Sequence, residues 1–375
     1  MTVEGGDPPR TVLIATDSFK TSVSASVAAA EIAAGWREVS QNDNLLLFPQ
    51  ADGGEGTLDA LERVVPGARR RSAGWVTGPD GRPTAGEWLQ LPDGVAVVEL
   101  AQCSGLPLML RPDALGASTR GLGEVISRAL DDGAVSLIIA LGGSASTDGG
   151  SGALSALGLT LVGHDGLALP DGGAALVGLV RLDQSALRAA PAGGVTLLTD
   201  VRSPLLGPDG AAAIFGPQKG ATSAEVRILD AGLRRFVEKW PGSTSPATPG
   251  AGAAGGTAWG FASTWGASIM PGAEYLADLS GLSAAMTSAD LVITGEGCCD
   301  STSLNGKVVG QVIALARREK VPVNLVVGQL ATVLDDDIVA VTLAELAESI
   351  EAAITDPRPQ LRAAGRLLAQ HRSLS

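Results

Sequence analysis

Short apolar runs alternate with helix-like stretches along the first 65 residues. Residues 11–15 (TVLIA) form an apolar run that ends at a polar pair, and residues 24–39 place apolar side chains at helical spacing. A second apolar run at 45–48 precedes another helix-like stretch at 57–65. Apolar runs of this length predict buried strands. The order strand, helix, strand, helix therefore predicts a parallel sheet.

The same pattern returns at the C-terminal end. Apolar runs predict strands at 289–294, 321–327 and 338–342. Helical spacing predicts helices at 307–318, 345–354 and 360–371. Because both ends of the chain carry the same alternation, we expect them to contribute strands to one sheet.

The pattern changes in the middle of the chain. Residues 75–99 place the turn signals GPDG and PDG between short β-prone runs, which indicates antiparallel hairpins. Residues 121–130 predict a helix, and residues 136–141 (SLIIAL) predict a strongly apolar strand that feeds a glycine-rich loop. The segment from about 160 to 280 is rich in Gly, Ala and Pro and less periodic.

We therefore predict an α/β protein with two domains. A discontinuous, Rossmann-like domain with a parallel sheet is expected from residues 1–65, 116–160 and 281–375. A second, inserted mixed α/β domain is expected from residues 66–115 and 161–280. The ligand loops should lie at the carboxyl ends of the parallel strands, where open α/β sheets bind their ligands.

Composition narrows the classes of function. The chain of 375 residues carries a formal net charge of −13, which argues against nonspecific binding to nucleic acid or to an anionic membrane. The sequence has no run of 18 apolar residues, and its start lacks the apolar core of a signal peptide. Three cysteines, two of them adjacent, do not make a disulfide framework. We expect a cytoplasmic protein.

Five loops rich in glycine or acidic residues carry the candidate chemistry. They are DSFK (17–20), DGGEG (52–56), GGSASTDGG (142–150), GAGAAGG (250–256) and TGEG (294–297). Glycine lets backbone N–H groups approach a ligand, and carboxylates in such loops hold Mg²⁺ or accept a proton. Several such loops in one chain indicate a phosphoryl-transfer site. The third loop lacks both the Gly-Lys-Ser/Thr ending of a P-loop and the GxGxxG spacing of a dinucleotide fold.

These loops also have structural interpretations. Asp17 and Ser18 are good helix caps, and Asp148 can cap the helix that follows its loop. Asp200 can be a base or a metal ligand, and Lys219 can neutralise a phosphate, but without further context the pattern favours surface charges for both.

Cysteine and histidine chemistry is not expected. Cys298 and Cys299 are adjacent, but nothing supplies the further ligands that zinc needs. His164 and His371 lie outside every loop named above, so a His-based triad is not expected.

Seven motifs, in this order, carry a resemblance to a known family. They are DSFK (17–20), ADGGEGT (51–57), ELAQCSGL (99–106), GGSASTDGG (142–150), TDVRSPLLGPDGAAAIFGPQKGA (199–221), GAGAAGG (250–256) and TGEGCCDSTSLNGK (294–307). Together they resemble the bacterial glycerate kinase family, the type that includes the glycerate 2-kinases. The resemblance extends from about residue 12 to about residue 368.

The resemblance implies ATP-dependent phosphorylation of D-glycerate with Mg²⁺. It implies a two-domain α/β fold whose active site lies in the cleft between the domains. It also favours the 2-hydroxyl as acceptor, so that the product is 2-phosphoglycerate rather than 3-phosphoglycerate.

Three positions depart from the family pattern. Ser203 stands where the family usually has Asn, Thr147-Asp148 where it often has Asn-Asp, and Thr302 where it commonly has Gln. Ser and Thr still donate and accept hydrogen bonds but reach less far. We expect these changes to affect substrate affinity more than reaction class.

The motifs give candidate roles in phosphoryl transfer. One or two of four carboxylates would hold Mg²⁺ together with waters: Asp52, Glu55, Asp148 and Glu296. Loop residues and lysines would bind the substrate and the phosphates: Ser18, Lys20, Gly142, Gly143, Ser144, Ser146, Lys219, Gly295 and Lys307. Asp200 is the first candidate for the catalytic base because it ends a strand inside the longest motif, and Asp300 is the second; Lys20 is also a candidate catalytic residue.

Two alternatives remain open. One is a kinase of a related small hydroxy acid or sugar acid. The other is a sensor that binds glycerate or nucleotide without turnover. The expected partners are D-glycerate and ATP, with neither nucleic acid nor membrane, and a homodimer is left open.

Overall fold

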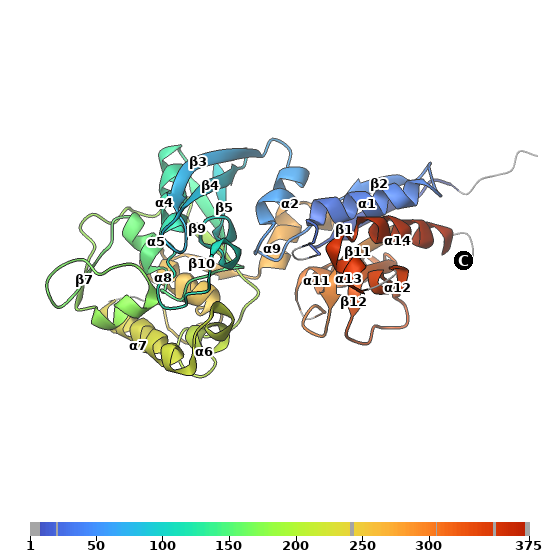
Figure 1. The fold of residues 1–375 in the computed structure, drawn as a ribbon. Coiled ribbons are helices and arrows are strands. Elements are labelled where there is room, and N and C mark those ends of the chain that lie inside the picture. The colour runs from blue at the N-terminus through green and yellow to red at the C-terminus, as the bar shows by residue number, and fades with distance from the viewer. Residues whose placement is uncertain (1–7, 20–21, 241–243, 305, 348–349, 372–375) are drawn as a thin grey trace, which may run out of the picture. The chain divides into compact units, whose positions relative to one another are not determined.

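The structure is a computed structural model that describes residues 8–19, 22–240, 244–304, 306–347 and 350–371. These residues form two compact units (Figure 1). Unit 1 is built from residues 1–52, 59–65 and 273–375, and unit 2 from residues 53–58 and 66–272. The predicted α/β class is confirmed. No helix in the described ranges is long and apolar enough to cross a membrane.

Unit 1 contains a sheet in which every pair of neighbouring strands is parallel. Its order in the described residues is β13-β12-β11-β1-β2. The strands are β1 (Thr11–Thr16), β2 (Asn44–Leu47), β11 (Leu291–Cys299), β12 (Val323–Leu330) and β13 (Val339–Thr342). The expectation that both ends of the chain share one sheet is confirmed.

Helices cover both faces of the unit 1 sheet. Because successive side chains of a strand point to opposite faces, Val12 and Ile14 of β1 pack in one core with α1 and α14, while Leu13 packs in the other core with α10 and α11. The helices are α1 (Ala25–Arg37), α9 (Gly272–Leu279), α10 (Leu282–Met286), α11 (Val308–Glu319), α12 (Leu343–Leu346), α13 (Ile350–Thr355) and α14 (Arg358–His371). Helix α2 (Thr57–Val64) begins in unit 2 and continues in unit 1.

Two elements of unit 1 differ from the sequence prediction. The predicted strand 289–294 is followed not by a loop but by more strand, since β11 continues through Gly295 and Glu296 to Cys299 and pairs with β12 along this part. The predicted helix 345–354 is two short helices, α12 and α13, on either side of residues outside the described ranges.

Unit 2 contains a mixed sheet. Its order in the described residues is β10-β9-β6-β5-β4-β3, with β3, β4 and β5 antiparallel and β5, β6, β9 and β10 parallel. The strands are β3 (Arg69–Thr77), β4 (Pro83–Gln90), β5 (Val95–Glu99), β6 (Ser136–Ala140), β9 (Val195–Leu198) and β10 (Ser268–Met270), with β7 (Thr160–Val162) and β8 (Arg181–Asp183) forming a separate ribbon. The predicted hairpins at 75–99 are confirmed.

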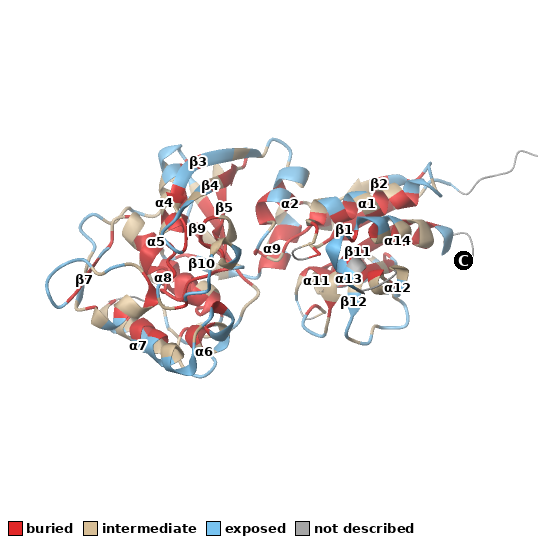
Figure 2. Ribbon diagram, viewed as in Figure 1, coloured by how far each residue is buried: buried red, intermediate tan, exposed pale blue. Residues whose placement is uncertain are grey.

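The central strands of this sheet are buried by helices, as the burial colours show (Figure 2). The helices of unit 2 are α3 (Leu100–Ser104), α4 (Arg120–Asp131), α5 (Ser151–Ala156), α6 (Ala211–Phe215), α7 (Ser223–Lys239) and α8 (Thr257–Trp265). Short 3₁₀ helices connect them: η1 (Leu106–Leu108), η2 (Gly173–Gly178), η3 (Pro217–Lys219) and η4 (Ala253–Gly256).

The predicted division into domains differs from the two units at residues 116–160. These residues belong to unit 2, because β6 pairs in parallel with β5 and β9 in the sheet of that unit. A strand, loop and helix at 136–156 have the same local pattern as those of unit 1, so the sequence alone does not reveal which sheet takes the strand. Residues 273–280, expected in the second domain, belong to unit 1.

Candidate active site

A carboxyl cluster lies at the carboxyl ends of β1 and β11 in unit 1. Asp17 directly follows β1, and its N–H donates to the carbonyl of Gly295 in β11 at 2.8 Å. Burial, and then the negative charges of Asp52 and Glu296, raise the pKa of Asp17 to about 8. The amide of Ser18, which donates to Asp17 Oδ1 at 2.6 Å, and the positive charge of Lys307 oppose this rise.

The cluster therefore combines several predicted site residues. Asp52, Glu296 and Lys307 lie close enough to Asp17 to alter its proton affinity, and Ser18 contacts it directly. Lys20 lies outside the described residues. Gly295 is placed inside β11, where it pairs with Thr16 and Val326.

Asp300 lies in a turn that follows β11. Its Oδ1 accepts hydrogen bonds from the N–H and hydroxyl of Thr302, at 2.8 and 2.6 Å, and from the N–H of Ser303 at 3.0 Å. These bonds lower the pKa of Asp300 to about 2. A carboxylate with so low a pKa is a weak base at neutral pH.

Unit 2 contains a buried lysine. Lys219 ends η3 and is only 3% exposed, and its Nζ donates to Ser144 Oγ at 3.1 Å and to the carbonyl oxygen of Ser146. Burial lowers the pKa of Lys219 to about 8, and the negative charge of Asp148 opposes this shift. The lysine therefore contacts the 142–150 loop directly, and the role of both in phosphate binding stays a prediction.

A cavity of about 380 Å³ opens beside this lysine. Its lining includes polar side chains and glycines: Glu55, Gly142, Gly143, Ser144, Thr199 and Lys219. Phe215 and Val201 add apolar surface. Predicted site residues from three separate motifs therefore line one cavity in unit 2.

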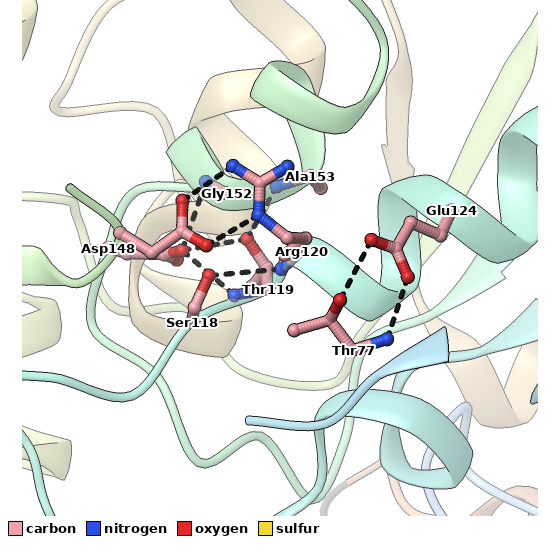
Figure 3. Close-up of polar contacts among 9 residues, drawn as sticks. Thr77, Ser118, Thr119, Arg120, Glu124, Asp148, Gly152 and Ala153 are labelled. Carbon is pink, nitrogen blue, oxygen red and sulfur yellow. Dashed lines mark hydrogen bonds and ion pairs between the residues drawn. The ribbon is translucent and has the colours of Figure 1, made fainter. Parts of the chain in front are cut away.

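Asp148 connects the 142–150 loop to the start of α4 (Figure 3). Its Oδ2 accepts from the N–H and hydroxyl of Thr119, at 2.9 and 2.8 Å, and from the N–H of Gly152 at 3.2 Å. Its Oδ1 accepts from the N–H of Gly150 at 3.1 Å. Burial raises its pKa even though all four bonds favour the charged form. The carboxylate thus fixes the shape of the loop, as its structural interpretation expects.

The GAGAAGG motif packs against the same loop. Gly255 has a φ of +63°, and a Cβ on it would lie 2.1 Å from the carbonyl oxygen of Ser146. Its own carbonyl accepts a hydrogen bond from the N–H of Gly149 at 3.0 Å. Only glycine combines this φ with so close a backbone approach. The motif therefore shapes the wall of the site.

Gly142 also lies at a close approach between two backbone segments. Its N–H donates to the carbonyl of Gly53 at 3.1 Å, and a Cβ on it would lie 2.4 Å from the Cα of Gly54. The amide of Gly142 is thus engaged within the protein, and Gly143 and Ser144 line the cavity beyond it.

Asp200 lies two residues after the end of β9. It is half-buried, and its Oδ1 accepts a hydrogen bond from the N–H of Gly272 at 2.9 Å. Both its chain neighbours, Thr199 and Val201, line the cavity beside Lys219. The backbone therefore brings this candidate base to the edge of the same site.

Similar proteins agree with the motif resemblance. The model of the glycerate kinase family matches residues 12–372. The chain belongs to the glycerate kinase family. It is 40% identical over 327 residues to a glycerate kinase of Bacillus subtilis and 40% identical over 326 residues to a glycerate 2-kinase of Escherichia coli, covering 85% of each protein in both comparisons. A crystal structure assigned to glycerate kinase 2 of Salmonella typhimurium LT2 is 33% identical, with a TM-score of 0.80 over 98% of this chain and 99% of that one.

Membership of the glycerate kinase family makes the protein a kinase. Two of its departures from the family pattern have clear local contacts. Thr302 donates twice to Asp300, and the carbonyl of Ser203 accepts from the N–H of Gly252 at 3.0 Å. Both residues thus take part in local hydrogen bonding.

Two carboxylates of this glycerate kinase family member were absent from the predicted site residues. Asp17 is one, although its motif was recognised. Glu99 is the other: it is fully buried, and its carboxylate accepts from the N–H groups of Gly56 and Leu58, both at 3.1 Å. An acidic residue at the end of the apolar run 95–98, inside a family motif, is the signal that could have revealed it.

The predicted metal ligands fall in different places. Asp52 and Glu296 belong to the unit 1 cluster, whereas Glu55 and Asp148 belong to unit 2. Across the described ranges, no group of three or more His, Cys, Asp or Glu side chains is placed to hold a metal ion.

Proposed function

We propose that this kinase transfers the γ-phosphoryl group of ATP to the 2-hydroxyl of D-glycerate. The observation that carries the proposal is the buried ammonium of Lys219 beside a cavity lined by Gly143 and Ser144. The name of the E. coli relative, glycerate 2-kinase, supports the choice of hydroxyl.

Lys219 would bind the carboxylate of glycerate. The ammonium is already desolvated, so an anion that enters the cavity meets a positive charge in a medium of low dielectric constant. An incoming carboxylate would also favour the protonated form of Lys219. Gly143 and the hydroxyl of Ser144 supply further polar contacts at the same wall.

Asp200 would accept the proton of the substrate hydroxyl. It stands between two residues of the cavity wall, and its position is fixed by the N–H of Gly272. Asp300, the second candidate, is less suited to this role because its pKa is about 2.

The unit 1 cluster fits Mg²⁺ together with phosphates. Burial is the main cause of the raised pKa of Asp17, and the nearby negative charges of Asp52 and Glu296 add to it. A divalent cation bound there would relieve the repulsion among these carboxylates. Mg²⁺ commonly uses only one or two carboxylates, with phosphate oxygens and waters completing its shell. Asp52 and Glu296 would hold the ion, which neutralises charge on the phosphates of ATP when bound. Lys307 would supply a second positive charge at the cluster.

A coupled assay of ADP release tests the proposal. The protein is mixed with ATP, Mg²⁺ and D-glycerate, and the phosphorylated position is determined by ³¹P NMR. We expect glycerate-dependent ADP release and 2-phosphoglycerate as the product. Formation of 3-phosphoglycerate would refute the regiochemistry and leave the kinase reaction standing.

The other outcomes separate the alternatives. Turnover with another small hydroxy acid or sugar acid, and none with D-glycerate, would assign a different substrate. Binding of glycerate or ATP in calorimetry without turnover would indicate a sensor.

A further inference from the structure

Unit 1 contains a cavity of its own, which the proposed roles leave unused. It measures about 230 Å³ and lies at the carboxyl ends of β11 and β12. Gly297 and Cys298 of β11 and Gly328 and Gln329 of β12 form one side of it. The opposite sides come from Phe19 and from residues of α12 and α13. Open parallel sheets bind ligands at this edge, so the cavity stands where a ligand is expected.

Two glycines lie next to each other in the lining of the cavity. Glu296 pairs with Val327 and Cys298 with Gln329, so Gly297 and Gly328 lie side by side on the two strands. A Cβ on Gly328 would lie 2.3 Å from the carbonyl oxygen of Gly297. Two adjacent residues without side chains expose bare backbone, against which a planar ring can lie closely.

The two strands also extend beyond their outer neighbours. The pairing of β1 with β11 ends at Gly295, and that of β13 with β12 ends at Val327, in the described part of the chain. β11 then continues to Cys299 and β12 to Leu330. A strand edge presents backbone donors and acceptors in fixed positions, which suits the ring nitrogens and amino group of a nucleobase.

The lining excludes a charged ligand. Among the described residues that line the cavity there is no Asp, Glu, Lys, Arg or His side chain. Phe19, Leu343 and Ala353 are buried and supply apolar walls. Moving a phosphate or carboxylate into such surroundings is unfavourable. The cavity therefore suits a flat, uncharged group of modest size.

The carboxyl cluster begins where this apolar lining ends. Glu296 directly precedes Gly297 on β11, and Asp17 precedes Phe19 by two residues after β1. We propose that the cavity binds the adenine ring of the nucleotide, with its phosphates directed to the cluster. This inference rests on the proposed function, in which ATP is the phosphoryl donor.

The reactivity of Cys298 tests the inference in the unaltered protein. The chain has three free cysteines, and Cys103 and Cys299 are buried whereas Cys298 is half-buried and lines the cavity. A thiol reagent such as N-ethylmaleimide should therefore label Cys298 first. Its rate of labelling is followed by peptide mass spectrometry with adenosine, ATP, inorganic tripolyphosphate or D-glycerate present.

Adenosine at about ten times its Kd should slow the labelling of Cys298 about tenfold, by mass action. ATP should do the same, whereas tripolyphosphate and D-glycerate should leave the rate unchanged because neither carries a base. Unprotected Cys298 in a protein that turns over ATP and glycerate would overturn the cavity assignment alone. Absence of both nucleotide binding and turnover would overturn the proposed function as well.

A filled cavity gives a second test. Ala344→Phe places a ring in the cavity and should raise the KM for ATP about tenfold while the KM for D-glycerate stays constant. The matched control is Val333→Phe, because Val333 is 90% exposed and does not line the cavity. Should Ala344→Phe lower the melting temperature sharply, Ile354→Ala removes an exposed side chain from the rim and should raise the KM for ATP about threefold. Equal KM values for ATP in the folded variants and the control would contradict the assignment.

Discussion

In each unit, one side chain near a predicted ligand loop has a pKa far from its ordinary value. The causes of the two pKa shifts differ. In unit 1 the pKa of Asp17 is raised to about 8 by burial and by the neighbouring carboxylates. In unit 2 the pKa of Lys219 is lowered to about 8 by burial, while Asp148 opposes the change. Crowded carboxylates are suited to a cation, and a desolvated ammonium to an anion. The two groups therefore differ in the charge that burial disfavours: a carboxylate in unit 1 and an ammonium in unit 2.

The largest expected effect tests whether unit 2 also supplies the base. Asp200→Asn keeps an oxygen that can accept from the N–H of Gly272 but cannot take a proton. We expect kcat to fall about 10²–10⁴-fold with unchanged substrate binding. Steady-state kinetics and calorimetry measure the two quantities. Asp300→Asn is the matched control and should retain most of the turnover; if it proves the more damaging of the two, the base lies in unit 1.

The next effect tests the anion site of unit 2. Lys219→Met removes the charge from the cavity, and we expect kcat/KM for D-glycerate to fall about 10²–10³-fold. Lys239→Met, at the last turn of α7, is the control for loss of a lysine in the same unit. Near-normal kcat/KM in Lys219→Met would show that the ammonium serves only the loop that it contacts.

A third prediction concerns the pH dependence of unit 1. Between pH 4 and 8 the folded chain holds a proton on Asp17 that the unfolded chain releases, so the stability contributed by this group is present at low pH and lost as the pH rises through about 8. Asp17→Asn should remove this dependence and stabilise unit 1 at pH 9 by on the order of a few kcal/mol. Hydrogen exchange of amides in β1 and β11 measures it. Asp336 is exposed, so the control Asp336→Asn should lose stability with rising pH as the wild type does. If Asp17→Asn lost stability in the same way, Asp17 would be excluded as the cause.

The smallest effect concerns the support of the Gly53–Gly56 loop. Glu99→Gln leaves one acceptor oxygen where two now bind the N–H groups of Gly56 and Leu58. We expect a loss of about 1–3 kcal/mol in the unfolding free energy of unit 2. Denaturant unfolding measures it, with the exposed Glu238→Gln as control. Equal stability of the two variants would mean that the loop does not depend on this carboxylate.

Much of the architecture could be predicted from residue patterns. The apolar run at 11–15 predicts β1, and both of its faces are buried, which is why the run shows no alternation. The strand at 136–141 was predicted correctly but assigned to the other domain, because local pattern carries no information on which strands become its neighbours. TGEG was taken for a loop since glycine usually interrupts strands, yet pairing with β12 holds it extended.

The candidate site shows a similar limit. The motifs containing Lys219 and Ser144 were recognised, but only the fold shows that the two side chains are in contact. The displaced pKa of Asp17 depends on Asp52 and Glu296, which are distant in sequence, so no local pattern reveals it. The individual catalytic and metal-binding roles stay predictions until the variants are measured.

The discontinuity of unit 1 has a consequence for synthesis. The strands β1 and β11 are neighbours, although residues that meet there, such as Thr11 and Asp290, are 279 positions apart. At a synthesis rate of about 5–20 residues per second, β11 is synthesised roughly 15–55 seconds after β1. Until then, β1 has no β11 to pair with. The whole of unit 2 emerges during that interval. Nascent chains of this kinase therefore expose two apolar strands while unit 2 is being synthesised, and chaperones that bind at the ribosome would have these strands to cover.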